Sequence, residues 1–133
     1  LADDSGLEVT ALNGRPGVLS ARYGGEKMPF DKKIEKLLGE LNSADSDDRS
    51  ARFVCSIAFA APDGNILGTV EGVCEGRICG APRGSNGFGY DPIFAPDGFG
   101  ETFGELPERI KARIGHRGRA FLQIIPILRD FLV

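Results

Sequence analysis

Apolar and polar residues alternate along three stretches of the chain, and this period of two predicts β-strands. The stretches cover residues 6–12, 52–61 and 66–78, and the sequence PDGN stands between the last two. Turn-forming residues between alternating stretches favour a hairpin, so residues 52–79 are predicted to form one long antiparallel hairpin. A further short strand is expected at residues 93–94.

Three other segments repeat apolar residues every three or four positions, as amphipathic helices do. These segments are 30–41, 107–113 and 116–132, and Pro126 predicts a kink in the third. Residues 80–100 between the strands and the last two helices are rich in Gly and Pro, and a loop of this length in a small domain is usually functional. The pattern as a whole predicts an α/β fold.

Glycines recur on one face of the predicted strand 66–78. Gly68, Gly72 and Gly76 share the parity of the apolar residues Val70 and Cys74. A row of residues without side chains on an otherwise apolar face indicates either a bend or another backbone that approaches closely.

The composition is that of an ordinary globular chain, with 133 residues, 41% hydrophobic and 26% charged. We expect one domain over residues 1–133. The net charge of -3 argues against a nucleic acid polymer as partner, and no apolar run approaches the ~20 residues of a membrane span. Cys55, Cys74 and Cys79 form no zinc-binding pattern and are expected to be reduced, which favours a cytoplasmic protein.

The chain begins with ADDSGLEV after one leucine, and in this motif two adjacent carboxylates precede a small hydroxyl and a glycine. We expect a tight turn at Asp3 and Asp4, followed by a strand. Paired carboxylates suit a magnesium ion, although neighbouring strand residues point to opposite sides and need not reach one ion. The alternative is an Asx-turn pair that only caps the turn.

The segment RGSNGFGYDP, residues 83–92, combines permissive glycines with Phe88 and Tyr90. Flexible backbone lets a flat ring approach, and an aromatic side chain stacks on a base with ~1–3 kcal/mol. A nucleobase pocket is one interpretation. The other is a structural loop in which both aromatic rings fill the core.

The segment KARIGHRGRA, residues 111–120, places Lys111, His116 and Arg117 around a helix break at Gly115. Cationic donors and free N–H groups at a helix start suit a phosphate or the carbonyl oxygen of a purine. The alternative is an ordinary solvated helix face.

Taken together, these segments resemble the Ham1 family of inosine triphosphate pyrophosphatases. The matching motifs follow the family order and cover almost the whole chain: ADDSGLEV, GRPGVLSARY, RFVCSIAFA with PDG, EGRI, PRGSNGFGYDPIF, TFGEL and HRGRA. The resemblance implies a long curved mixed β-sheet with flanking helices, a homodimer and a magnesium-dependent reaction. That reaction hydrolyses ITP, dITP or XTP to the monophosphate and pyrophosphate.

The resemblance also implies roles for single residues. Asp4 matches the acidic residue that acts as general base or binds Mg2+, and Asp3 beside it is the second candidate metal ligand. Phe88 matches the residue that stacks on the base, and the basic group recognises the 6-oxo purine. The implied substrate-binding residues are Ser5, Phe88, Tyr90, Asp91, Lys111, His116 and Arg117.

Two features depart from the family pattern. Family members carry a phosphate loop, [ST]-x-N-x-x-K, and then a glutamate before the acidic segment. Neither is in this sequence, so the resemblance implies a family domain that lacks its N-terminal phosphate-loop portion. Gly115 also stands where a serine is usual. Two alternatives to an enzyme therefore stay open: a purine-nucleotide binding module without catalysis, and a fragment that serves only in subunit association.

Overall fold

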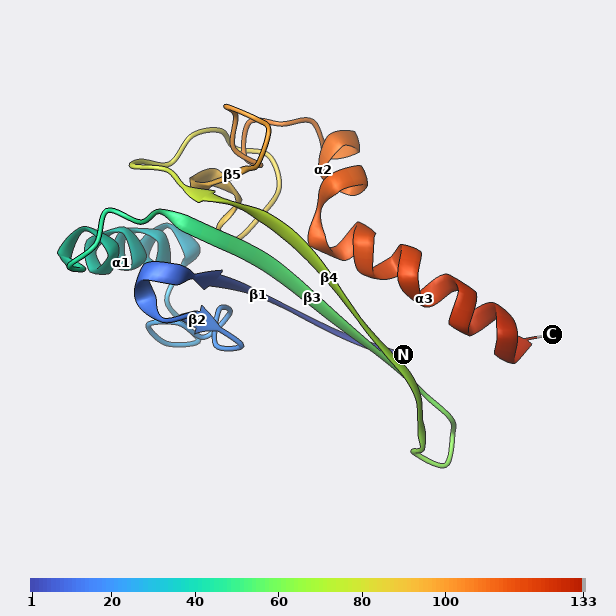
Figure 1. Cartoon of the computed structure of the whole chain (residues 1–133). Coiled ribbons are helices and arrows are strands. Elements are labelled where there is room, and N and C mark those ends of the chain that lie inside the picture. The colour runs from blue at the N-terminus through green and yellow to red at the C-terminus, as the bar shows by residue number, and fades with distance from the viewer. Residues whose placement is uncertain (133) are drawn as a thin grey trace.

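The computed structural model describes residues 1–132 and contains one five-stranded sheet with helices beside it (Figure 1). The strand order is β2-β1-β3-β4-β5. The strands are β1 (Ala2–Val9), β2 (Pro16–Gly17), β3 (Ser50–Ala60), β4 (Ile66–Ile78) and β5 (Phe94–Pro96). The α-helices are α1 (Phe30–Ser43), α2 (Glu108–Ile114) and α3 (His116–Leu132), and short 3-10 turns occupy Thr10–Leu12 and Asp91–Ile93.

The long hairpin predicted for residues 52–79 is confirmed as β3 and β4, which pair antiparallel from Ser50↔Arg77 to Ala60↔Ile66. A register shift at Phe59 and Ala60 precedes the turn. The break between the last two helices at Gly115 and the short strand in the Gly-rich segment are also confirmed. Helix α3 continues through Pro126.

Two sequence-based expectations need correction. The acidic segment is not a turn, because Asp3 and Asp4 lie within β1 and pair with Ile57 and Ser56 of β3. Backbone pairing along the whole of β1 extends the strand past the polar residues, which side-chain pattern alone does not reveal. In addition, every pairing within residues 1–132 is antiparallel, so this part of the sheet is not mixed.

Strand alternation gives the sheet one apolar face, which carries Leu7, Phe53, Cys55 and Cys74. Helix α3 packs on this face through Ala120 and neighbouring residues. Figure 1 shows α3 running along the curved hairpin and α1 near the opposite end of the sheet.

The sequence left two explanations for the glycine row in β4, a bend or a close backbone approach, and the structure shows the close approach. A Cβ atom built on Gly72 would lie 2.1 Å from the carbonyl oxygen of His116, at the start of α3. A Cβ atom on Gly76 would lie 2.4 Å from the carbonyl oxygen of Ala95 in β5. The missing side chains therefore let α3 and β5 lie directly on β4.

Candidate functional site

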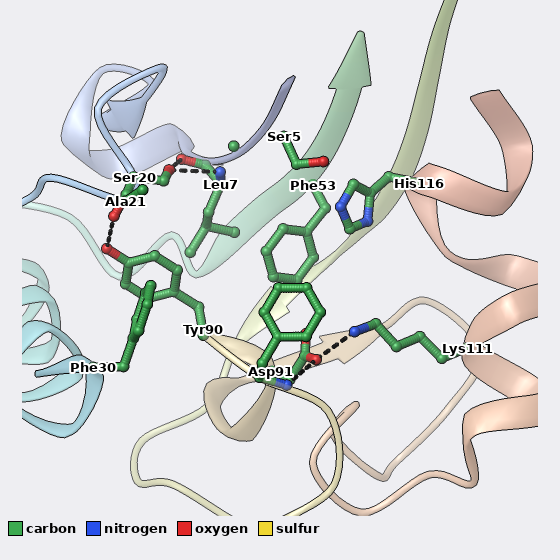
Figure 2. Close-up of a pocket in the computed structure, with 13 residues that line it drawn as sticks. Ser5, Leu7, Ser20, Ala21, Phe30, Phe53, Tyr90, Asp91, Lys111 and His116 are labelled. Carbon is green, nitrogen blue, oxygen red and sulfur yellow. Dashed lines mark hydrogen bonds and ion pairs between the residues drawn. The ribbon is translucent and has the colours of Figure 1, made fainter. Parts of the chain in front are cut away.

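An open pocket of about 110 Å3 lies between the apolar face of the sheet, the Gly-rich segment and the junction of α2 and α3 (Figure 2). Six residues predicted from the sequence line it: Ser5, Phe88, Tyr90, Asp91, Lys111 and His116. A second cavity of about 310 Å3 shares Phe88, Lys111 and His116 with the first and adds Arg117. Segments from the two ends of the chain thus converge on one place.

The Gly-rich segment supplies one aromatic ring to the core and one to the pocket, so both interpretations of this segment hold in part. Tyr90 is 4% exposed, and its hydroxyl donates to the carbonyl oxygen of Ser20 at 2.7 Å. The rings of Phe30 and Tyr90 pack edge to face, with centroids 5.3 Å apart. Phe88 is 65% exposed and leaves its ring available to a ligand.

Asp91 connects the Gly-rich segment to α2. Its carboxylate accepts the backbone N–H of Phe88 at 3.0 Å and forms an ion pair with the Lys111 ammonium at 2.5 Å. Burial raises the pKa of Asp91, and the bonds from Lys111 and Phe88 act in the opposite direction. The same ammonium lies 4.5 Å from the centre of the Phe88 ring, so Lys111 orients both the carboxylate and the exposed ring.

His116 stands at the wall between the two cavities. Its imidazole stacks on Phe53 with centroids 4.8 Å apart and is 7% exposed. Burial, reinforced by the charges of Lys111 and Arg117, lowers the pKa of His116 to about 4. The ring is therefore neutral near pH 7, and it carries one N–H donor and one acceptor nitrogen.

Two buried polar atoms at this pocket have no hydrogen-bond partner within residues 1–132: Ser5 Oγ and His116 Nδ1. A buried polar atom without a partner costs about 1–3 kcal/mol, and native proteins seldom tolerate it without a reason. Figure 2 shows Ser5 and His116 near Phe53 among the residues that line the pocket. Both residues line the same pocket, so these two atoms are candidates for bonding a polar ligand.

The two N-terminal carboxylates lie on opposite faces of the sheet, because they are neighbours in β1. Asp3 is on the pocket face, and its carboxylate lies 3.3 Å from Arg117 Nε. Asp4 lines a different cavity of about 160 Å3, together with Ser5, Ser56 and Glu71. The joint magnesium site of Asp3 and Asp4 stays a prediction, and this geometry favours Asp4 alone.

Ser5 borders both cavities and so connects the two faces. Strand β2 pairs with β1 only at Leu7 and Glu8, so residues 2–6 form a sheet edge without a neighbour on that side within residues 1–132.

Sequence patterns do not identify part of the pocket wall. The spacing of Phe30 and Phe53 predicts a place in the core for both, and Ser20 carries no chemical signal of its own. Ser20 acts through its carbonyl oxygen and its hydroxyl, which accept from Tyr90 and from the N–H of Leu7. Its place in the motif GRPGVLSARY is the only indication in the sequence.

Comparisons with known proteins identify the family of this chain. The model of the Ham1 family matches residues 1–127. A dITP/XTP pyrophosphatase from Synechococcus is 51% identical over 99% of this chain and 62% of its own length. One from Syntrophobacter fumaroxidans is 52% identical over 93% of this chain and 52% of its own length.

Solved structures give the same result. A Ham1 protein from Coxiella burnetii has a TM-score of 0.90 and 45% identity, over 97% of this chain and 66% of that protein. The Ham1 protein of Staphylococcus aureus has a TM-score of 0.89 and 43% identity, over 98% and 66%. The chain therefore spans about two thirds or less of the length of these relatives. On the match of motifs, family model and fold, the chain belongs to the Ham1 family.

Proposed function

We propose that this protein hydrolyses ITP, dITP or XTP to the nucleoside monophosphate and pyrophosphate. The observation that carries the proposal is the pair of unpartnered buried atoms, Ser5 Oγ and His116 Nδ1, at a pocket walled by aromatic rings. Relatives that are 51% and 52% identical are named dITP/XTP pyrophosphatases, which supports this choice of substrate class.

The pocket suits a purine with an oxygen at C6. The exposed Phe88 ring offers a face for stacking, and Lys111, Arg117 and His116 offer donors around it. A carbonyl oxygen at C6 accepts from these donors. Adenine presents an amino donor at the same position and would leave buried donors without partners, which disfavours it strongly.

Asp4 is the proposed general base. Its carboxylate is exposed and forms no ion pair within residues 1–132, whereas Glu8 on the same face pairs with Arg52 at 2.7 Å. A nucleotide whose purine stacks on Phe88 extends its phosphates past Ser5 toward Asp4. Asp4 takes a proton from water while the water oxygen bonds to the α-phosphorus, and the bond from this phosphorus to the pyrophosphate group breaks, so that pyrophosphate leaves.

The residues around Asp4 fit a magnesium ion in part. Carboxylate and hydroxyl oxygens suit this hard cation, which usually retains water and binds substrate phosphates. Within residues 1–132 no three His, Cys, Asp or Glu side chains gather closely enough to hold a metal alone. We therefore propose Asp4 as one ligand among substrate oxygens and water. The ion would neutralise phosphate charge during the reaction.

Three further predictions accompany this function: a homodimer, a cytoplasmic location, and no nucleic acid polymer as partner. The free thiols of Cys55, Cys74 and Cys79 support a reducing compartment. No helix within residues 1–132 combines the length and the apolar character needed to cross a bilayer.

The test measures pyrophosphate release from ITP, XTP and ATP with Mg2+. We expect release from ITP and XTP and little from ATP. Asp4→Asn should lose activity by several orders of magnitude because the base is removed, while Asp45→Asn, the same change in an exposed loop, should not.

Other outcomes contradict hydrolysis. If no pyrophosphate is released but ITP raises the melting temperature, the protein is a binding module. If ITP has no effect on melting either, only subunit association is left as a role. Equal release from ATP would refute the proposed recognition of the C6 oxygen.

A further inference from the structure

A separate cavity of about 480 Å3 opens where the chain leaves β4, and three arginines line it: Arg49, Arg77 and Arg83. It shares no lining residue with the cavities of the candidate site. Figure 1 shows this end of β4 near α1 and away from α2 and α3. Among residues 1–132 no carboxylate lines this cavity, although the whole protein has a net charge of -3.

The charges of two of these arginines are not compensated. Arg83 is held in place by Glu105 at 3.4 Å and by the carbonyl oxygen of Gly100 at 2.9 Å. Arg77 donates to a backbone carbonyl oxygen at 3.3 Å, and Arg49 to the side-chain oxygen of Asn42 at 3.0 Å. Within residues 1–132 neither Arg77 nor Arg49 forms an ion pair, so two positive charges face neutral acceptors only.

Arg49 also has an unused donor. Its Nη1 atom is buried and has no hydrogen-bond partner within residues 1–132. Leaving such a donor unsatisfied is unfavourable, because the group has lost its bonds to water and gained none in return. Arg49 lines the cavity, so an anion bound there would neutralise its charge.

We propose that this cavity binds a multiply charged phosphate anion, either free pyrophosphate or the phosphate chain of a nucleotide. Guanidinium groups present paired N–H donors that match phosphate oxygens, and such bonds are about twice as strong as those between neutral groups. Two guanidinium groups without an ion-pair partner within residues 1–132, beside a third that pairs with Glu105, favour an anion with several charges over one with a single charge. Binding at this cavity does not depend on the reaction proposed above.

Cys79 reports on the occupancy of the cavity. Its thiol lines the wall, is partly exposed and accepts a weak hydrogen bond from Arg83 Nη2 at 3.5 Å. The other two cysteines, Cys55 and Cys74, are buried. An uncharged alkylating reagent should therefore modify Cys79 first, and a bound anion should shield it.

The experiment follows iodoacetamide modification of Cys79 by peptide mass spectrometry, without Mg2+, at increasing pyrophosphate. We expect pyrophosphate to slow the modification with a saturable midpoint, and Arg49→Gln with Arg77→Gln to raise that midpoint roughly tenfold or more. The matched control, Arg113→Gln with Arg129→Gln, removes the same charge from exposed helix positions and should leave the midpoint unchanged. Arg117→Gln should also leave it unchanged, since Arg117 lies at the other site.

A nucleoside triphosphate, titrated in parallel, distinguishes the two sources of phosphate. A lower midpoint for pyrophosphate identifies a free anion, and a lower midpoint for the nucleotide identifies its phosphate chain. Melting temperatures of all variants without anion verify folding. The proposal is overturned if neither anion slows modification of the wild-type protein at millimolar concentration, or if both double variants respond alike.

Discussion

The contact between β4 and α3 permits a sharp test of how this fold is held together. Replacing Gly72 by Ala adds one methyl group, which would lie 2.1 Å from the carbonyl oxygen of His116 and 2.4 Å from the backbone nitrogen of Ala120. Both atoms belong to the backbone of α3, so no side chain can rotate to make room. The helix itself must move by roughly 1 Å to restore an ordinary contact distance.

Overpacking of this kind costs about 1–3 kcal/mol, and a clash with two backbone atoms belongs at the upper end. For a chain of this length, 1 kcal/mol corresponds to roughly 3–4 °C in melting temperature, so Gly72→Ala should lower it by about 10 °C. Gly39 in α1 offers a matched control, because its added methyl group meets nothing within 4 Å. Gly39→Ala should stabilise the helix by about 1 kcal/mol, or ~3 °C.

Thermal unfolding followed by circular dichroism gives both values. The displacement should also reach the pocket, because the added methyl group clashes with the carbonyl oxygen of His116, and His116 lines the pocket. We expect weaker nucleotide binding by Gly72→Ala at a temperature where the variant is folded. Equal melting temperatures for Gly72→Ala and Gly39→Ala would show that α3 does not lie on β4 as described.

Two further predictions concern the charges of the pocket. Because the pKa of His116 is lowered to about 4, the unfolded chain binds more protons than the folded protein between that value and the ordinary 6.5, so stability falls as the pH falls through this window. Urea unfolding across the window should show a loss on the order of 3 kcal/mol from this group, and His116→Phe, which retains an aromatic ring beside Phe53, should show a shallower slope. An identical slope in both proteins would refute the assignment. Lys111→Met removes the partner of buried Asp91 and should destabilise the fold by about 3–5 kcal/mol at pH 7, and adding Asp91→Asn should restore much of this loss. A double variant no more stable than Lys111→Met would contradict the role of this ion pair.

Local patterns in the sequence are sufficient for most of the secondary structure. The hairpin of residues 52–79 follows from strict alternation around PDGN, and the break between α2 and α3 follows from Gly115. The glycine row of β4 narrows the possibilities to a bend or a close backbone approach, and the structure shows the approach. These features depend on residues near one another in the chain, where spacing and turn chemistry act directly.

The acidic segment is a case in which local sequence patterns predict the wrong secondary structure. Asp3 and Asp4 look like a turn because polar residues and a glycine gather there, yet backbone pairing with Ile57 and Ser56 of β3, far along the chain, makes them part of a strand. That pairing places Asp3 beside Arg117 and Asp4 on the other face. Side-chain spacing cannot foresee a hydrogen-bonded partner so distant in the sequence.

The amino-acid order alone fixes the residue types of the site, since the motifs that resemble the Ham1 family contain Ser5, Phe88, Lys111 and His116. Two properties of the site emerge only when the chain is folded: which polar atoms are buried without partners, and the support that the ring of Phe53 gives to His116. Burial and hydrogen-bond satisfaction depend on every segment packed around an atom, whereas a sequence motif specifies only its neighbours along the chain.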